Sequence, residues 1–136
     1  MLKILVIGLG YVGTANAVLL SQNNEVTCFD IDISKSKNFV NGISPIEDKE
    51  VTEYLSSKKL YLKTVNNYPT EIDNFDIAII ATPTNYDIET NKFDTSSIEQ
   101  SLENIQNSNS NPTVIIRSTV PVGYVKKIQN KFPNLE

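Results

Sequence analysis

The fold is decided by the stretch KILVIGLGYVG at residues 3–13, near the start of a chain of 136 residues. Its first half is a short, wholly apolar run that ends at Gly8. Such a run is typical of a strand that is buried on both faces, as the central strands of a parallel sheet are. Its second half leads into residues 11–21, where apolar side chains recur at helical spacing and predict a helix. The stretch therefore predicts a strand, a tight turn and a helix.

Three glycines occupy the turn in the pattern G-x-G-x-x-G, and each has a separate expected role. Gly8 permits the tight turn, Gly10 lets a pyrophosphate approach the backbone, and Gly13 lets the helix pack against the strand. The N–H groups of the first helical turn, which includes Tyr11 and Val12, would face the anion. The alternative is a plain strand–turn–helix unit whose glycines serve only packing.

Asp30 follows the second predicted strand, residues 25–29, and lies 17 residues past Gly13. With the glycines, it completes the pattern of a dinucleotide-binding unit. A carboxylate here would accept hydrogen bonds from the adenosine ribose and repel a 2′-phosphate, so NAD is favoured over NADP. The alternative is a solvated carboxylate in a turn. For nearby Asp32 and Lys35, solvated side chains are the default interpretation, although Lys35 could reach the cofactor.

Predicted strands and helices alternate through the rest of the chain. The strands are residues 61–64, 77–81 and 113–116, and the last two are expected to be buried. Helices are expected at 34–41 and at 45–58, the second with a capping box of Ser44 and Glu47. A further helix begins at 96 with a capping box of Ser96 and Glu99, and a last helix follows residue 123 and runs through 131. Residues 82–94 are expected to be a polar loop. This alternation specifies an α/β fold with a Rossmann-type, doubly wound parallel sheet of strand order 3-2-1-4-5. Ligands then bind beyond the carboxyl ends of the strands, between the first and fourth.

Two segments with hydroxyl side chains follow strands at this place. Thr84, beyond Pro83, would point toward the pyrophosphate or the nicotinamide ribose, and an ordinary strand-ending turn is an equal alternative. Thr119 follows the last strand and is expected nearer the nicotinamide.

Composition excludes several classes of function. The 12 Lys and Arg against 16 Asp and Glu give a net charge of −4, which argues against nucleic acid or an anionic membrane surface as a partner. Without His and with one Cys, the chain has neither the usual ligands of a zinc site nor a His-based triad. That cysteine, Cys28, lies in an apolar strand and is expected in the core. A lone Cys and no membrane-spanning or signal segment indicate a cytoplasmic protein of one domain.

Six segments resemble, in order and in spacing, the UDP-glucose/GDP-mannose dehydrogenase family. They are KILVIGLGYVG (3–13), EVT leading to DI (25–31), NGISPI (41–46), ATPTNY (81–86), FDT (93–95) and STVPVG (118–123). The loop at 85–91 resembles the branch of the family that oxidises UDP-glucose. The resemblance implies an NAD-dependent oxidation of the sugar C6 alcohol to a carboxylate, giving UDP-glucuronate by two hydride transfers and a thioester on a catalytic Cys.

By position, five residues match NAD-contacting residues of the family: Val12, Asp30, Lys35, Thr84 and Thr119. Thr119 also borders the reacting centre, in a supporting role. The family's catalytic Glu, Lys, Asn and Cys have no counterpart among these residues.

The resemblance therefore implies that residues 1–136 are an NAD-binding domain that binds NAD without catalysing the reaction alone. The central helical and UDP-sugar-binding domains are absent from this chain. The full-length protein is expected to be a homodimer that takes the nucleotide sugar UDP-glucose as substrate. Two alternatives stay open: a sister dehydrogenase acting on UDP-N-acetylmannosamine or GDP-mannose, and a non-catalytic NAD-binding module.

Overall fold

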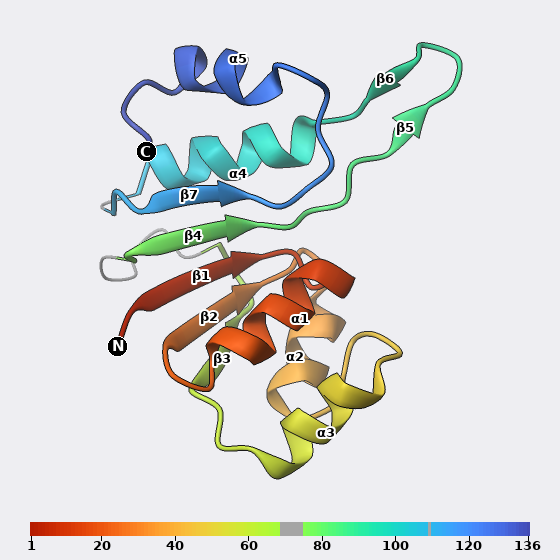
Figure 1. Ribbon diagram of the computed structural model, residues 1–136, viewed down its shortest axis with the longest axis vertical. Helices are drawn as coiled ribbons and strands as arrows, with labels where there is room; N and C mark the ends of the chain where they lie inside the picture. Colours follow the sequence, from red (N-terminus) through yellow and green to blue (C-terminus); the bar gives the residue numbers. More distant parts are fainter. Residues whose placement is uncertain (69–74, 109) are drawn as a thin grey trace.

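The computed structural model describes residues 1–68, 75–108 and 110–136. A parallel sheet of five strands lies at its centre, in the order β3-β2-β1-β4-β7 (Figure 1). The strands are β1 (Lys3–Ile7), β2 (Glu25–Phe29), β3 (Leu62–Val65), β4 (Ile77–Ile80) and β7 (Thr113–Ile116). This arrangement confirms the predicted strand order, in which β7 is the fifth strand.

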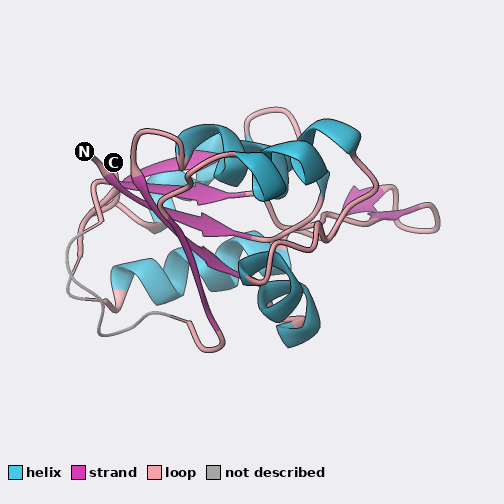
Figure 2. Ribbon diagram, turned by 90° about the horizontal axis from the view of Figure 1, so that it is seen from below, coloured by secondary structure: helices cyan, strands magenta, loops and turns pink. Residues whose placement is uncertain are grey.

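Helices cover both faces of the sheet (Figures 1 and 2). One face carries α1 (Tyr11–Leu20), α2 (Ile33–Val40) and α3 (Lys49–Ser57), and the other carries α4 (Ser96–Gln106) and α5 (Tyr124–Lys131). Successive side chains of a strand point to opposite faces. Ile4 and Val6 accordingly pack in the core beneath α1, and Leu5 and Ile7 in the core beneath α4. The apolar run of β1 therefore serves two cores.

The register of the central strands brings their ends to one edge of the sheet. Ile7 pairs with Phe29 of β2 on one side and with Ile80 of β4 on the other. The residues that follow these three positions are Gly8, Asp30 and Ala81, and they leave the sheet together. Parallel pairing thus assembles the site from segments far apart in the chain.

The third helix begins later than predicted. It starts at Lys49 instead of residue 45, because the Asp48 carboxylate is the N-cap and accepts a hydrogen bond from Val51 N at 2.9 Å. The hydroxyl of Ser44 instead bonds the backbone of Ile46, donating to its carbonyl at 2.7 Å. Ser and Asp both favour such local bonds, so Ser44 and Asp48 are both candidates for the N-cap. In the structure the helix begins after Asp48.

The capping box predicted for α4 is also wrong, although the helix begins at Ser96 as expected. Thr95 is the N-cap and makes no side-chain capping bond, while the Asp94 carboxylate accepts from Ser96 N at 3.0 Å. The aspartate stands two residues before Ser96 and forms an Asx turn, which satisfies the N–H group without the serine side chain.

The predicted polar loop at 82–94 contains a hairpin of β5 (Tyr86–Asp87) and β6 (Lys92–Phe93), which projects from the body of the molecule (Figures 1 and 2). Asn91, with φ of 51°, supplies a left-handed turn residue, and the rings of Tyr86 and Phe93 meet edge to face at 5.1 Å. Strands of two residues are too short for an alternating pattern to reveal.

The prediction of a buried last strand is wrong. Thr113 and Ile115 of β7 are exposed, and Val114 and Ile116 are half-buried. The strand lies at the edge of the sheet and pairs with β4 on one side. By contrast, Cys28 of β2 is buried in the core as predicted, and burial raises the pKa of its thiol. In the described ranges, no helix combines the length and hydropathy that crossing a membrane requires.

Candidate functional site

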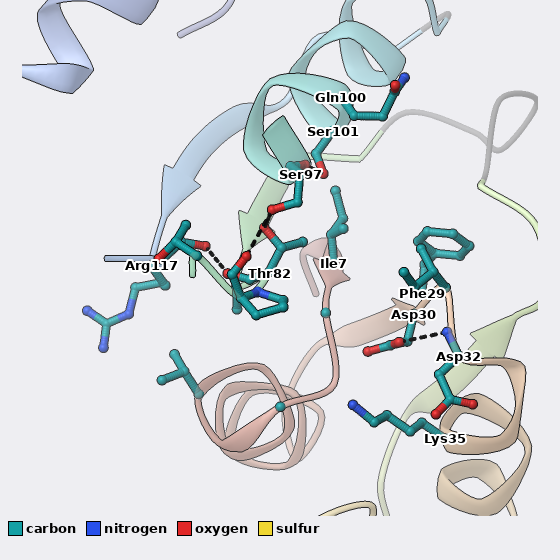
Figure 3. Close-up of a pocket in the computed structure, with 18 of the residues that line it drawn as sticks. Ile7, Phe29, Asp30, Asp32, Lys35, Thr82, Ser97, Gln100, Ser101 and Arg117 are labelled. Carbon is teal, nitrogen blue, oxygen red and sulfur yellow. Dashed lines mark hydrogen bonds between the residues drawn. The ribbon is translucent and has the colours of Figure 1, made fainter. Parts of the chain in front are cut away.

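A cleft of about 1000 Å³ opens beyond the carboxyl ends of β1, β2, β4 and β7 (Figure 3). One wall consists of the glycine-rich turn and the start of α1. A second is formed by the residues after β2, and the opposite wall by the segments after β4 and β7 together with α4. The cleft therefore lies at the predicted switch point of the sheet.

The three glycines meet different surroundings. A Cβ added at Gly8, whose φ is +97°, would lie 2.6 Å from the carbonyl oxygen of Ala81, and one at Gly13 would lie 1.8 Å from that of Gly8. Both positions need glycine because backbone approaches them closely. A Cβ at Gly10 would meet no heavy atom within 4 Å. Gly10 thus borders open space, as a position that admits a ligand to the backbone should.

Helix α1 begins at this open position. Gly10 is its N-cap and offers no side chain, and its carbonyl accepts from Thr14 N at 2.9 Å. The first N–H groups of a helix have no partner within it, and the helix dipole adds partial positive charge there. Tyr11 and Val12 belong to this turn, line the cleft and are 64% and 42% exposed. This end of the cleft suits a negatively charged group.

Asp30 is buried rather than solvated, with 9% of its surface exposed. Its carboxylate accepts from Leu9 N at 2.6 Å and, through the other oxygen, from Asp32 N at 2.8 Å. The aspartate after β2 therefore ties down the glycine-rich turn after β1. No local sequence pattern indicates this bond to Leu9, because its partners are 21 residues apart.

Asp32 and Lys35 lie on the same wall as Asp30 (Figure 3). Asp32 is exposed and caps α2, accepting from the hydroxyl of Ser34 at 2.5 Å and from its N–H at 3.0 Å. These bonds to Ser34 lower the pKa of the Asp32 carboxyl. Lys35 is half-buried and lines the cleft. Asp32 thus has a structural role in addition to its charge.

Hydroxyl groups dominate the opposite wall. Thr84 Oγ1 donates to the carbonyl oxygen of Thr119 at 2.8 Å, so these two predicted residues lie side by side. Ser118 Oγ donates to the carbonyl of Thr82 at 2.7 Å. The segments after β4 and β7 are therefore joined by side-chain bonds on both sides of Pro83.

Helix α4 contributes residues that the sequence analysis missed. Four of its polar side chains line the cleft: Ser97, Gln100, Ser101 and Asn104. Their spacing of i, i+3, i+4 and i+7 is that of one helix face, next to the apolar face of Ile98, Leu102 and Ile105. This polar stripe is the sequence signal that could have revealed them. Arg117, the only arginine of the chain, and Tyr68 also line the cleft.

The arrangement has the chemistry to hold a dinucleotide. An anion-binding helix end lies between a carboxylate wall suited to ribose hydroxyls and a hydroxyl wall at the other side. Within residues 1–68, 75–108 and 110–136, no group of three His, Cys, Asp or Glu could hold a metal ion.

Comparison with known proteins gives concordant results. The model for the UDP-glucose/GDP-mannose dehydrogenase family, NAD binding domain, matches residues 2–134. The UDP-glucose 6-dehydrogenase of Campylobacter jejuni is 47% identical over 133 residues, which are 96% of this chain and 34% of that protein. The enzyme of the same name from Streptococcus pneumoniae is 41% identical and matches 96% of this chain and 33% of its own length. The chain thus spans about a third of these curated relatives.

Solved structures agree with the fold. The UDP-D-ManNAc dehydrogenase from Pyrococcus horikoshii superposes with a TM-score of 0.83 at 25% identity, over 97% of this chain and 32% of that one. The UDP-N-acetyl-mannosamine dehydrogenase Cap5O from Staphylococcus aureus has a TM-score of 0.71 at 27% identity, over 96% and 33%. The shared region is in each case about a third of the larger chain.

Proposed function

This chain belongs to the UDP-glucose/GDP-mannose dehydrogenase family, whose NAD-binding domain it matches over residues 2–134, and we propose that it supplies the cofactor site of an enzyme oxidising UDP-glucose to UDP-glucuronate. The observation that carries the proposal is the open approach to Gly10 at the start of α1, in the same cleft as the buried carboxylate of Asp30. The identity of 41–47% to two UDP-glucose 6-dehydrogenases supports UDP-glucose over the sugars of sister enzymes.

The residues present fit NAD. The pyrophosphate would lie against Gly10 and the first N–H groups of α1, at Tyr11 and Val12, where a helix end favours an anion. Each carboxylate oxygen of Asp30 already accepts one N–H group but has a second acceptor position, so the adenosine ribose can still be bound. Lys35, on the same wall, would contact the ribose or a phosphate.

Hydrogen-bond chemistry favours one of the two ligands expected for Thr84, the nicotinamide ribose. Its hydroxyl proton is used in the bond to the Thr119 carbonyl, while its oxygen keeps lone pairs that can accept. A pyrophosphate oxygen can only accept, whereas a ribose hydroxyl can donate. Thr84 would therefore accept from the nicotinamide ribose, and the nicotinamide would then lie near Thr119.

Replacing Thr84 with valine tests this contact. Valine keeps the shape but removes the hydroxyl, so NAD should bind about tenfold more weakly, the effect of one lost hydrogen bond of about 1.4 kcal/mol. Thr84→Ser keeps the hydroxyl and should restore most of the affinity, as measured by isothermal titration calorimetry. Wild-type affinity in the valine variant would contradict the assignment.

NAD bound here would accept one hydride in each of the two oxidation steps, with a second NAD replacing the NADH formed in the first. Thr119 would border the reacting centre in a supporting role. The resemblance implies that the nucleophilic Cys and the catalytic Glu, Lys and Asn belong to other parts of the enzyme. Residues 1–136 would then bind NAD without oxidising sugar. The full-length enzyme would be a homodimer with a nucleotide-sugar substrate.

Titration of this chain with NAD and NADP tests the cofactor assignment. NAD should bind at least about tenfold more tightly, because Asp30 and Asp32 repel the 2′-phosphate of NADP. Equal affinity for the two would refute it.

The substrate is tested on the full-length protein. UDP-glucose should give two NADH per sugar, and UDP-N-acetylmannosamine and GDP-mannose should give little. Preferential oxidation of either of these sugars would make the protein a sister dehydrogenase, and NADH formation by residues 1–136 alone would place the chemistry in this domain.

A further inference from the structure

Ser97 of α4 reaches across to the segment that follows β4 (Figure 3). Its hydroxyl lies 3.0 Å from Thr82 Oγ1 and 3.1 Å from the carbonyl oxygen of Pro83, and these two acceptors share its single proton. Ser97 and Thr82 are 15 residues apart and line the same wall of the cleft. The contact therefore links the helix to the loop at the switch point of the sheet.

Thr82 is held from a second direction as well. Ser118 Oγ, from the segment after β7, donates to the Thr82 carbonyl at 2.7 Å. One serine thus fixes the backbone of Thr82 and the other fixes its side chain. Both side chains are half-buried, which makes their positions better defined than those of solvated hydroxyls.

The direction of these bonds determines what Thr82 can offer a ligand. A threonine hydroxyl has one proton and two lone pairs. At Thr82 a lone pair is occupied by Ser97, and none of the hydrogen bonds among the described residues uses the Thr82 proton. At Thr84 the proton is consumed by the Thr119 carbonyl. The two threonines flanking Pro83 are therefore complementary, since Thr82 is free to donate and Thr84 is free to accept.

We propose that Ser97 is a positioning residue for cofactor binding, which sets the Thr82 hydroxyl to donate to an acceptor oxygen of the bound dinucleotide. The acceptor is either a pyrophosphate oxygen or the carboxamide oxygen of the nicotinamide, since both accept hydrogen bonds and donate none through that atom. The inference rests on the proposed binding of NAD in this cleft and goes beyond it by assigning a function to α4.

Calorimetric titration of the 136-residue chain with NAD and with ADP-ribose tests the Thr82 contact. Thr82→Val should weaken NAD binding about tenfold, and Thr82→Ser should restore most of the affinity. A loss for both ligands assigns the bond to the pyrophosphate, and a loss for NAD alone assigns it to the carboxamide. Wild-type affinity of Thr82→Val for both ligands would overturn the proposal.

A double-mutant cycle tests the part played by Ser97. Ser97→Ala should weaken NAD binding about threefold in the wild-type chain but have almost no effect in Thr82→Val, because Ser97 acts through Thr82. A threefold loss in both backgrounds would mean that Ser97 acts independently, and would refute the positioning role. Ser57→Ala is the matched control, since that hydroxyl bonds only locally to the Glu53 carbonyl on α3 and its loss should not change NAD affinity.

Thermal unfolding of each variant without ligand separates binding from stability. Affinity changes with an unchanged melting temperature support a role in binding, whereas a fall in melting temperature that accounts for the weaker binding would contradict it. If the wild-type chain does not bind NAD, the proposed function itself fails. Binding by the wild type with no effect at Thr82 refutes only the present inference.

Discussion

Replacing Gly13 with alanine is expected to destabilise the fold by about 3 kcal/mol or more, which is a large part of the stability of a domain of this size. The new Cβ would lie 1.8 Å from the carbonyl oxygen of Gly8, a backbone atom that no side-chain rotation can move aside. Helix α1 would have to shift away from the sheet. Urea unfolding followed by circular dichroism measures the loss.

Gly10→Ala is the matched control from the same motif, and the opposite result is expected. A Cβ there meets no heavy atom within 4 Å, and the φ of −82° is open to any residue. Stability should change by less than about 1 kcal/mol. NAD binding should nevertheless fall at least about tenfold, because the methyl group occupies the approach of the pyrophosphate. Near wild-type stability of Gly13→Ala would contradict the packing argument.

Asp30→Asn should weaken NAD binding about a hundredfold and abolish the preference for NAD over NADP. The substitution removes the charge that repels a 2′-phosphate. It also leaves one of the two N–H groups, of Leu9 or Asp32, facing an amide NH₂ instead of an oxygen. Each hydrogen bond to a carboxylate contributes about 1.5–3 kcal/mol. The substitution therefore weakens the contact with the ribose and also disturbs the conformation of the glycine-rich turn. Calorimetry with both dinucleotides measures the effect.

The control is Asp32→Asn, which makes the same change of charge two residues along. Asp32 is exposed and its carboxylate accepts from Ser34, within α2, while its bond to Asp30 uses only the backbone N–H group and survives the substitution. NAD affinity should change less than about threefold, because an exposed charge is screened by water. Equal losses in the two variants would mean that charge alone matters and that the bond from Leu9 to Asp30 does not.

The elements that could be predicted were those with a strong local pattern. The apolar run of β1 and the helical spacing after Gly10 predicted a strand and a helix, and both are present. Elements that depend on competition between similar local bonds were mispredicted. At α3 the capping residue is Asp48 and not Ser44, and both side chains satisfy the local rules for a cap. Only the packed structure selects between them.

Two other wrong predictions, a buried β7 and a loop without strands at 82–94, are explained by the tertiary structure. Three of the four residues of β7 are apolar, as are all four of β4, yet β7 is partly exposed because it lies at the sheet edge. The hairpin of β5 and β6 is a pair of two-residue strands, stabilised by cross-strand contacts such as that between Tyr86 and Phe93. Neither edge position nor pairing partner is encoded in a short window of sequence.

By itself, the sequence determined the strand–turn–helix unit, the need for glycine at positions 8 and 13 and the place of Asp30 after the second strand, because these follow from residues that are close in the chain and from the periods of strand and helix. The tertiary structure alone decided that Asp30 holds the turn through Leu9, that α4 forms a wall of the cleft, and that Thr82 accepts a hydrogen bond from Ser97 while Thr84 donates one to Thr119. These features are hydrogen bonds between segments 15 to 35 residues apart. Their partners and directions are set only when the parallel strands align and bring their carboxyl ends to one edge.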